Sequence, residues 1–124
     1  MTLEEHVKGN INGETWEVTH YLAMAYQADH LGMPDVADAL RRIALDEANH
    51  GARFIFLDGQ VNDLKANVEK MLAGEKAAYE GKHNGMNSAL EAGKKEVASW
   101  FDTAAHDEDR HAKILQGLLD RNFK

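Results

Sequence analysis

Two short phrases in the sequence combine acidic residues with a histidine at helical spacing. Residues 46–50 read DEANH and residues 107–111 read DEDRH, so the pattern Glu-x-x-His recurs after 61 residues. Residues at positions i and i+3 of an α-helix lie about 60° apart, so both side chains of each pair can point the same way. A carboxylate and an imidazole presented together suit a transition metal. The two phrases therefore suggest two halves of one metal site.

The motif is weak when it stands alone. Eleven Glu and seven His in this chain give on the order of 0.6 matches by chance, and the chain holds four. Helical phase separates them. Glu47 shares a helix face with the apolar residues Val36, Leu40, Ile43 and Phe54. Glu108 does the same with Phe101, Ala104, Ala112, Leu115 and Leu119. We therefore expect Glu47 and Glu108 to point inward, and we interpret three residues of the other two matches as surface residues: His20, Glu80 and His83.

An internal repeat links the two phrases. Residues 13–50, aligned with residues 74–111, are identical at ten of 38 positions, and the matches include a Gly-Glu pair and a turn glycine. The repeat adds Glu14 and Glu75, each 33 residues before its Glu-x-x-His. A duplicated helical hairpin is the simplest explanation. The candidate metal ligands are then Glu14, Glu47, His50, Glu75, Glu108 and His111.

The elements that must position these residues are helices. Apolar residues recur at helical spacing, the chain has one proline, and nothing alternates as a strand would. Gly32, Gly59 and Gly93 mark helix ends, and Pro34 marks a helix start. The predicted helices run roughly over 3–31, 34–58, 62–91 and 95–121. We expect one all-α domain over 1–124, a four-helix bundle made of hairpin 1 (1–59) and hairpin 2 (62–124).

Composition excludes several classes of protein. There is no cysteine, so disulfides, zinc fingers, iron–sulfur clusters and rubredoxin-type iron centres are excluded from this chain. A net charge of −7 without clustered basic residues argues against a nucleic-acid partner. No stretch resembles a signal peptide or a membrane span, so we expect a cytoplasmic protein with no membrane partner.

Charge explains how many ions the six ligands would hold. Four carboxylates carry −4, two divalent ions carry +4 and the imidazoles bind as neutral groups, so the site ends near neutrality. This ligand set is the one found in ferritin-like di-iron and di-manganese bundles. We expect Glu47 and Glu108 to bridge the ions and Glu14 and Glu75 to lie at opposite ends. Mixed oxygen and nitrogen ligation favours two iron ions per site, with manganese as the alternative.

The chain resembles the rubrerythrin family over nearly its whole length. The resemblance rests on GETWEVTHY (13–21), IALDEANH (43–50), AGEKAAY (73–79) and HDEDRHA (106–112). It implies a ferritin-like fold and a di-iron peroxidase that reduces hydrogen peroxide to water as a defence against oxidative stress.

The sequence departs from the family pattern at one carboxylate. Rubrerythrins usually carry a second Glu one turn after the third-helix ligand, but this chain has Ala78 there, and the first helix carries Glu17 instead. Our hypothesis is that Glu17 is a movable seventh carboxylate at the metal site; the alternative is a surface Glu. Tyr21, one turn further on, is either a hydrogen-bond donor to a metal ligand or a core aromatic residue.

The lack of a rubredoxin-type centre leaves the electron source open. An external donor such as a rubredoxin would have to reduce the site. The same ligands also suit a ferroxidase or iron-handling protein, or a di-iron protein that reduces O2. A third reading is a non-catalytic helical interaction module with incidental Glu and His residues.

The connection between the second and third predicted helices suggests an assembly. The ferritin-like fold implies that these helices run parallel, but three residues, 59–61, reach only roughly 10 Å of the roughly 35 Å needed. The alternative is a simple up-down-up-down bundle. We expect a homodimer that exchanges helical hairpins, with each site formed by hairpin 1 of one chain and hairpin 2 of the other.

Overall fold

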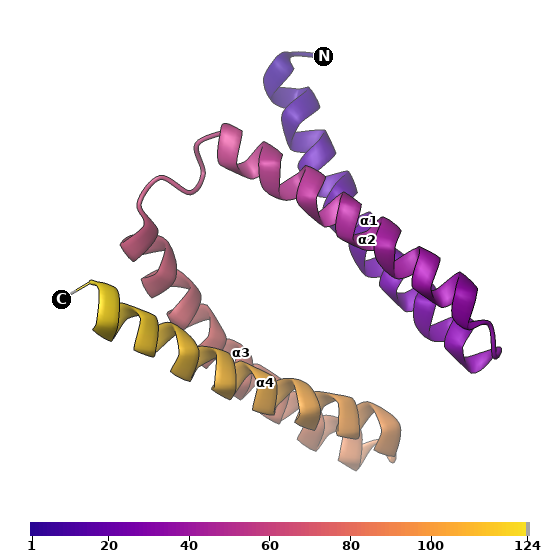
Figure 1. Ribbon diagram of the computed structural model, residues 1–124. Helices are drawn as coiled ribbons and strands as arrows, with labels where there is room; N and C mark the ends of the chain where they lie inside the picture. The colour runs from indigo at the N-terminus through magenta and orange to yellow at the C-terminus, as the bar shows by residue number, and fades with distance from the viewer. Residues whose placement is uncertain (124) are drawn as a thin grey trace. The chain divides into compact units, whose positions relative to one another are not determined.

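The computed structural model describes residues 1–123, and they form four α-helices with no strand among them (Figure 1). Their bounds are α1 Leu3–His30, α2 Pro34–Leu57, α3 Leu64–Glu91 and α4 Lys95–Asn122. Within the described residues the all-α prediction is confirmed, and each predicted boundary lies within two residues of the observed one. The chain divides into two compact units, residues 1–61 and residues from 62 onward, which we call hairpin 1 and hairpin 2.

Two of the four helices, α1 and α3, begin where a side chain satisfies free backbone N–H groups. Thr2 caps α1, because its hydroxyl accepts from the Glu5 amide at 3.1 Å while the Glu5 carboxylate accepts from the Thr2 amide at 2.8 Å. The Asp63 carboxylate caps α3 by accepting from the Ala66 amide at 3.1 Å. This cap explains why α3 begins two residues later than predicted. The α2–α3 connection accordingly covers residues 58–63, six residues where three were predicted.

The first three helices end at a glycine in the left-handed region. Gly32, Gly59 and Gly93 have φ values of 70°, 77° and 72°. After α1, the Met33 amide donates to the Ala28 carbonyl at 2.9 Å, and the other two ends repeat this arrangement. Only glycine adopts this backbone without a steric penalty, so these residues fix the turns of both hairpins and the end of α2.

Small residues form most of the contact between the helices of each hairpin. The residues buried within the hairpins are mostly alanines, and three of them recur at the 61-residue offset. The buried residues are Ala25, Ala28, Ala37, Ala44, Gly51, Leu72, Ala89, Ala98 and Ala105. Side chains this small let two helix backbones approach closely, which brings residues on facing helices within ligand distance.

One part of the predicted core is wrong for the hairpin taken alone. Val36 and Ile43 were expected to be buried beside Glu47, but they are 41% and 39% exposed. Leu40 and Phe54, from the same stripe, are partly buried. The physical reason is that the alanines Ala37 and Ala44, not the larger residues beside them, lie against α1. Hairpin 1 therefore keeps an uncovered apolar strip next to its inward carboxylate.

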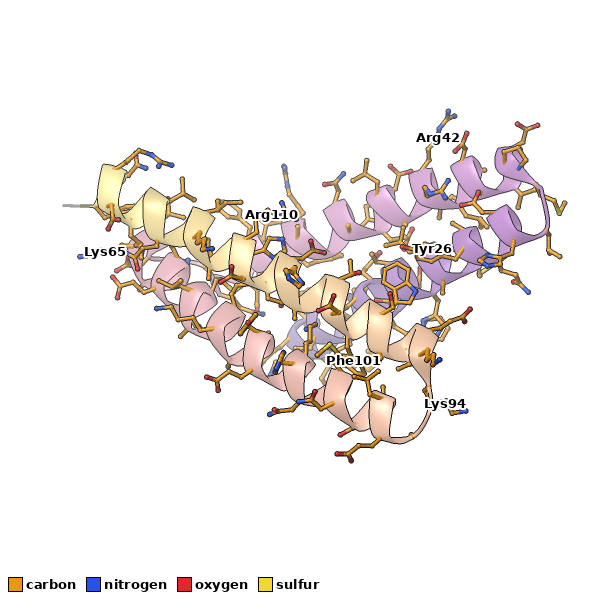
Figure 2. All side chains as sticks on the ribbon, turned by 90° about the horizontal axis from the view of Figure 1, so that it is seen from below. Tyr26, Arg42, Lys65, Lys94, Phe101 and Arg110 are labelled. Carbon is orange, nitrogen blue, oxygen red and sulfur yellow. The ribbon has the colours of Figure 1, made fainter. Side chains whose placement is uncertain are left out.

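The exposed surface of each hairpin carries both charged and large apolar side chains. Arg42 and Lys65 project outward from α2 and α3 (Figure 2), and Arg41 on α2 pairs with Asp29 on α1. Among the described helices, none combines the length and apolar character that crossing a lipid bilayer requires.

Candidate metal centre

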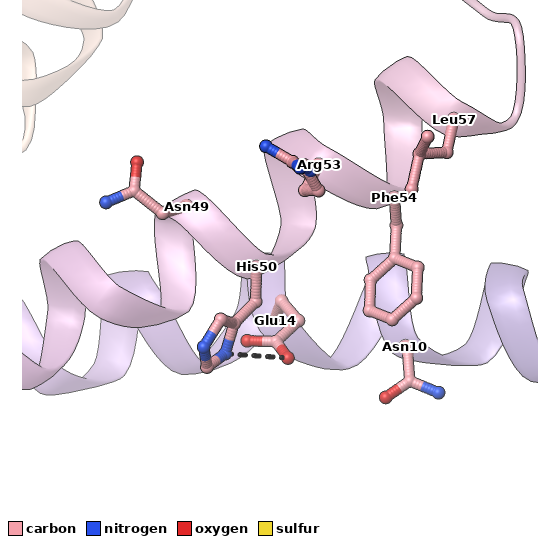
Figure 3. A pocket seen from close by; sticks show the side chains of 7 residues that line it. All are labelled: Asn10, Glu14, Asn49, His50, Arg53, Phe54 and Leu57. Atoms are coloured by element: carbon pink, nitrogen blue, oxygen red, sulfur yellow. Dashed lines mark ion pairs between the residues drawn. The ribbon is translucent and has the colours of Figure 1, made fainter.

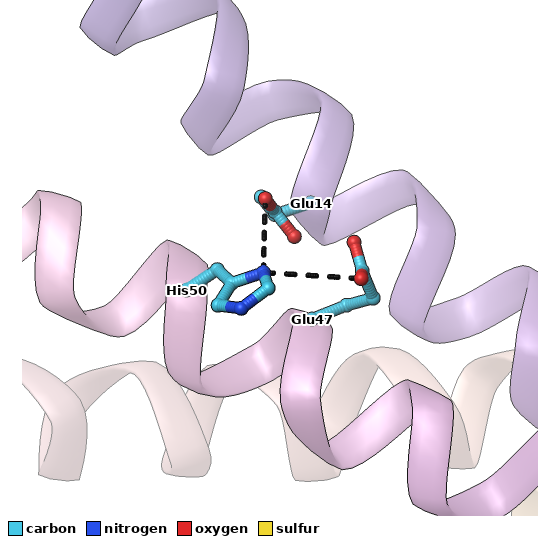
Figure 4. A group of neighbouring side chains, drawn as sticks. All are labelled: Glu14, Glu47 and His50. Atoms are coloured by element: carbon cyan, nitrogen blue, oxygen red, sulfur yellow. Dashed lines mark ion pairs between the residues drawn. The ribbon is translucent and has the colours of Figure 1, made fainter.

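Hairpin 1 brings three of the predicted ligands together. Glu14 comes from the middle of α1, and Glu47 and His50 come from successive turns of α2 (Figure 4). The His50 Nδ1 atom lies 3.5 Å from Glu14 Oε1 and 3.8 Å from Glu47 Oε1. One ligand atom from each residue lies within 4.8 Å of the others. We call these three residues the hairpin-1 ligand group.

Hairpin 2 repeats the arrangement with its own residues. Glu75 comes from α3, and Glu108 and His111 come from α4. The His111 Nδ1 atom lies 3.4 Å from Glu75 Oε2 and 3.7 Å from Glu108 Oε1, and the three residues again meet within 4.8 Å. We call them the hairpin-2 ligand group. The predicted duplication thus reappears as geometry, with each distance reproduced to 0.1 Å.

A glycine on α2 makes room for the hairpin-1 ligand group. Gly51 is buried, and a Cβ atom built there would lie 3.3 Å from the Cβ of Glu14. The close approach of α1 and α2 at this point turns Glu14 toward His50. A hollow lies beside the pair and is lined by Asn10, Glu14, Asn49, His50, Arg53, Phe54 and Leu57 (Figure 3). The His50 ring faces the Glu14 carboxylate at the edge of this hollow.

The carboxylates of both groups are mostly withdrawn from water. Side-chain exposure is 13% for Glu14, 19% for Glu47, 21% for Glu75 and 17% for Glu108. Among the described residues, Glu14 Oε2 and Glu75 Oε2 are buried and accept no hydrogen bond; the 3.4 Å His111 contact lacks hydrogen-bond geometry. A buried polar atom left unsatisfied costs about 1–3 kcal/mol, and more when it is charged. A bound cation at each group would remove this cost, so the donor set fits a metal.

Glu17 lies next to the hairpin-1 ligand group. It is half-buried, and its carboxyl group hydrogen-bonds the Glu47 carboxylate. That hydrogen bond, with desolvation and the charge of Glu47, raises the pKa of Glu17, while the nearby His50 opposes the rise. Glu17 therefore lies beside the ligand Glu47 but outside the ligand group itself, and its role as a seventh ligand stays a prediction.

Tyr21 lies one turn beyond Glu17 on α1. It is half-buried and lines a hollow with Trp16, Glu17, His20 and Met24. Its proposed hydrogen bond to a metal ligand stays a prediction.

The three residues expected at the surface are exposed in their hairpins. His20, Glu80 and His83 belong to neither ligand group. The His20 ring stacks on Trp16 and its Nδ1 atom lies 2.8 Å from the Trp16 carbonyl oxygen, which accounts for its polar atom without a metal. Helical phase thus separated the two motif matches that join a ligand group from the two that do not.

Sequence reasoning missed one residue beside the hairpin-2 ligand group. The Lys82 ammonium group on α3 lies 3.6 Å from Glu108 Oε2. The signal was present, because position 82 matches Tyr21 under the 61-residue offset. The alignment of the two halves of the repeat thus shows a tyrosine in the first half and a lysine at the equivalent position of the second half.

Comparison with known proteins decides the family. The rubrerythrin family model matches residues 5–119, which contain both ligand groups. The chain belongs to the rubrerythrin family. The membership confirms the ferritin-like fold class expected from the sequence and implies a di-iron protein, for which the two ligand groups are the candidate metal ligands.

Two relatives of this rubrerythrin-family chain are similar over almost all of its length. It is 46% identical over 123 residues to an uncharacterised protein of Methanocaldococcus jannaschii, covering 98% of this chain and 87% of the relative. It is 40% identical over 122 residues to reverse rubrerythrin-1 of Clostridium acetobutylicum, covering 97% of this chain and 67% of the relative. In this chain the additional carboxylate, Glu17, lies in the first half of the repeat.

Proposed function

We propose that this protein is a non-haem di-iron peroxidase that reduces hydrogen peroxide to water with electrons from a separate donor protein. The observation that carries the proposal is the pair of equivalent Glu, Glu and His groups, each with a buried carboxylate oxygen that lacks a hydrogen bond among the described residues. Together they supply the six ligands of a binuclear site.

The reaction must deliver two electrons and two protons to one peroxide molecule to give two water molecules. Two bound iron ions would supply one electron each and polarise the O–O bond as Lewis acids. The residues of the chain then have to place a proton donor near the bond that breaks, because hydroxide is a poorer leaving group than water.

Glu17 is the residue best placed to hold that proton. Its raised pKa means that it keeps a proton to a higher pH than an ordinary Glu does, and its hydrogen bond to Glu47 keeps that proton beside the ligand group. Tyr21, one turn away on α1, is a second O–H donor near Glu17. In this proposal Glu17 and Tyr21 pass protons to the departing oxygen, and the half-burial of both residues limits competition from bulk water.

Rapid mixing of the reduced, iron-loaded protein separates this activity from its alternatives. A peroxidase should reoxidise at least tenfold faster with hydrogen peroxide than with an equal concentration of O2. A faster reaction with O2, or repeated oxidation of added Fe(II) that leaves ferric iron in the protein, would replace the proposal with oxidase or ferroxidase activity. The ligand variant His111→Ala should lose the fast peroxide phase, and the matched control, His83→Ala on α3, should keep it.

The proposal also includes assembly as a hairpin-exchanged dimer. Val36 and Ile43 form an apolar strip on the same face as Glu47, and hairpin 1 alone leaves this strip exposed. The six residues 58–63 can reach about 20–25 Å, while α2, with 24 residues, is about 36 Å long. A connection this short cannot carry the chain back along α2 so that α3 runs parallel to it. A second copy of the chain would supply the missing hairpin.

A further inference from the structure

The two ligand groups contain the same three residue types, but the side chains next to them differ in charge. In hairpin 2 the Lys82 ammonium group lies 3.6 Å from Glu108 Oε2. The Lys82 side chain is 35% exposed and that of Glu108 is 17% exposed, so the contact is partly shielded from water. In hairpin 1 the equivalent ligand, Glu47, has the acid Glu17 as its neighbour instead.

The 61-residue offset shows that two substitutions produce this difference. Glu17 corresponds to Ala78, so hairpin 2 has lost a carboxylate or hairpin 1 has gained one. Tyr21 corresponds to Lys82, so only hairpin 2 carries a cation at that position. With carboxylates ionised and histidines neutral, and with Glu17 left out because its pKa is raised, the hairpin-1 ligand group carries −2. The hairpin-2 ligand group and Lys82 carry −1.

Another cation near hairpin 1 does not cancel this difference. Arg53 lines the hollow beside Glu14 and His50. Within residues 1–123, however, no ion pair joins Arg53 to a residue of the hairpin-1 ligand group, whereas Lys82 forms one directly with Glu108. Position 114, the equivalent of Arg53 in hairpin 2, is isoleucine.

We propose that Lys82 is a built-in counter-ion of Glu108 and makes the two metal positions unequal in affinity. The position at hairpin 1 binds its divalent ion first. The position at hairpin 2 binds its divalent ion more weakly. The inference rests on the proposed metal-binding function. A cation arriving at hairpin 2 must compete with Lys82 for the Glu108 carboxylate and then stay near its positive charge, and both effects oppose binding. Among the described residues, a cation arriving at hairpin 1 meets no ammonium or guanidinium group paired with a ligand. Lys82 is therefore a positioning residue that sets the order of loading.

The test is a Mn2+ titration of the metal-free full-length protein, with free Mn2+ measured by electron paramagnetic resonance. The wild type should bind two ions per set of six ligands, in two steps whose affinities differ at least tenfold. Lys82→Met should tighten the weaker step about tenfold and leave the stronger one within twofold. Lys82→Arg keeps the charge and should keep the two unequal steps. Lys70→Met, an exposed lysine on the same helix, is the matched control and should change neither step.

Ligand variants assign the steps to the hairpins. His111→Ala should abolish the weaker step and His50→Ala the stronger one. Two equal steps in the wild type, or a Lys82→Met titration identical to the wild type, would overturn the inference while leaving the proposed function standing. A wild-type protein that binds no Mn2+ would overturn both.

Discussion

The His50 Nδ1 atom lies 3.5 Å from Glu14 Oε1, although the two residues lie on different helices and 36 positions apart. The contact depends on the turn at Gly32 and on the close approach of α1 and α2 at Gly51. Both features lie within hairpin 1, and hairpin 2 has the matching turn at Gly93 and the matching contact between His111 and Glu75. Each hairpin therefore presents its three ligands in a preformed arrangement, which lowers the entropic cost of binding an ion.

Removal of one imidazole tests whether these preformed groups bind metal. His50→Ala should lower the bound metal by about one ion per set of six ligands after dialysis against a weak chelator, because a ligand in direct contact is lost. Metal content measured by mass spectrometry checks this. His20→Ala is the control, since His20 stands in the same Glu-x-x-His pattern but is exposed and stacked on Trp16. Equal losses of metal in both variants would contradict the assignment of His50, and not His20, as a metal ligand.

How much of this arrangement the sequence predicts depends on how each residue is constrained. The ligand positions follow from helical phase and from the repeat, because a fixed rotation per residue places Glu47 and His50 on one side. The turns follow from glycine, because φ values near +70° exclude most other residues. These features are local, and one sequence suffices to predict them.

Lys82 and the apolar strip were not predicted, for a different reason. A lysine side chain is long and flexible, so helical phase does not determine which carboxylate it reaches. Val36 and Ile43 have the periodicity of core residues, but the contact with α1 is made by the alanines beside them. Periodicity shows which face is apolar, and it does not show which partner covers that face. The start of α3 was misplaced because the cap at Asp63 was not used.

The raised pKa of Glu17 predicts how its contribution to stability varies with pH. Because the folded state holds this proton more tightly than the unfolded state, stability from Glu17 is fully present below the ordinary Glu pKa of 4.5 and is lost as pH rises through the folded value. Glu17→Gln keeps a hydrogen-bond donor and removes the ionisation. In metal-free protein, the variant should match the wild type near pH 4 and become the more stable of the two toward pH 7.

Thermal unfolding of both proteins across that pH range measures this difference. Glu80→Gln, an exposed acid on α3, should show no such divergence. A gap between Glu17→Gln and wild type that stays constant with pH would show that Glu17 has no shifted titration.

Two glycines of α3 should respond in opposite directions to alanine. A Cβ atom at Gly81 would meet nothing within 4 Å, so Gly81→Ala should raise the free energy of unfolding by about 0.5–1 kcal/mol through helix propensity. A Cβ atom at Gly85 would lie 2.7 Å from Cε1 of Phe101, so that ring must shift. Overpacking costs about 1–3 kcal/mol, so Gly85→Ala should lower the free energy of unfolding. Urea denaturation of the pair checks both signs, and a stabilised Gly85→Ala would show that Phe101 yields freely.

Hairpin exchange can be tested by combining two defective chains. One chain carries Glu47→Ala and His50→Ala, which destroy the hairpin-1 ligand group. The other carries Glu108→Ala and His111→Ala, which destroy the hairpin-2 ligand group. Each homodimer lacks two of the six ligands at every site, so neither should bind metal tightly or react with peroxide.

The heterodimer distinguishes the exchanged assembly from the unexchanged one, because hairpin exchange would place both defective ligand groups in the same site. If each site takes hairpin 1 from one chain and hairpin 2 from the other, both defects fall in one site and the second site regains all six native ligands. Co-expressed chains with different affinity tags, purified on both, should then recover about half of the wild-type metal content and half of its peroxide activity. If each chain completes its own bundle, every site keeps one defect and nothing is recovered. Recovery therefore requires that ligands cross between chains, and its absence in a purified heterodimer would exclude the exchanged assembly.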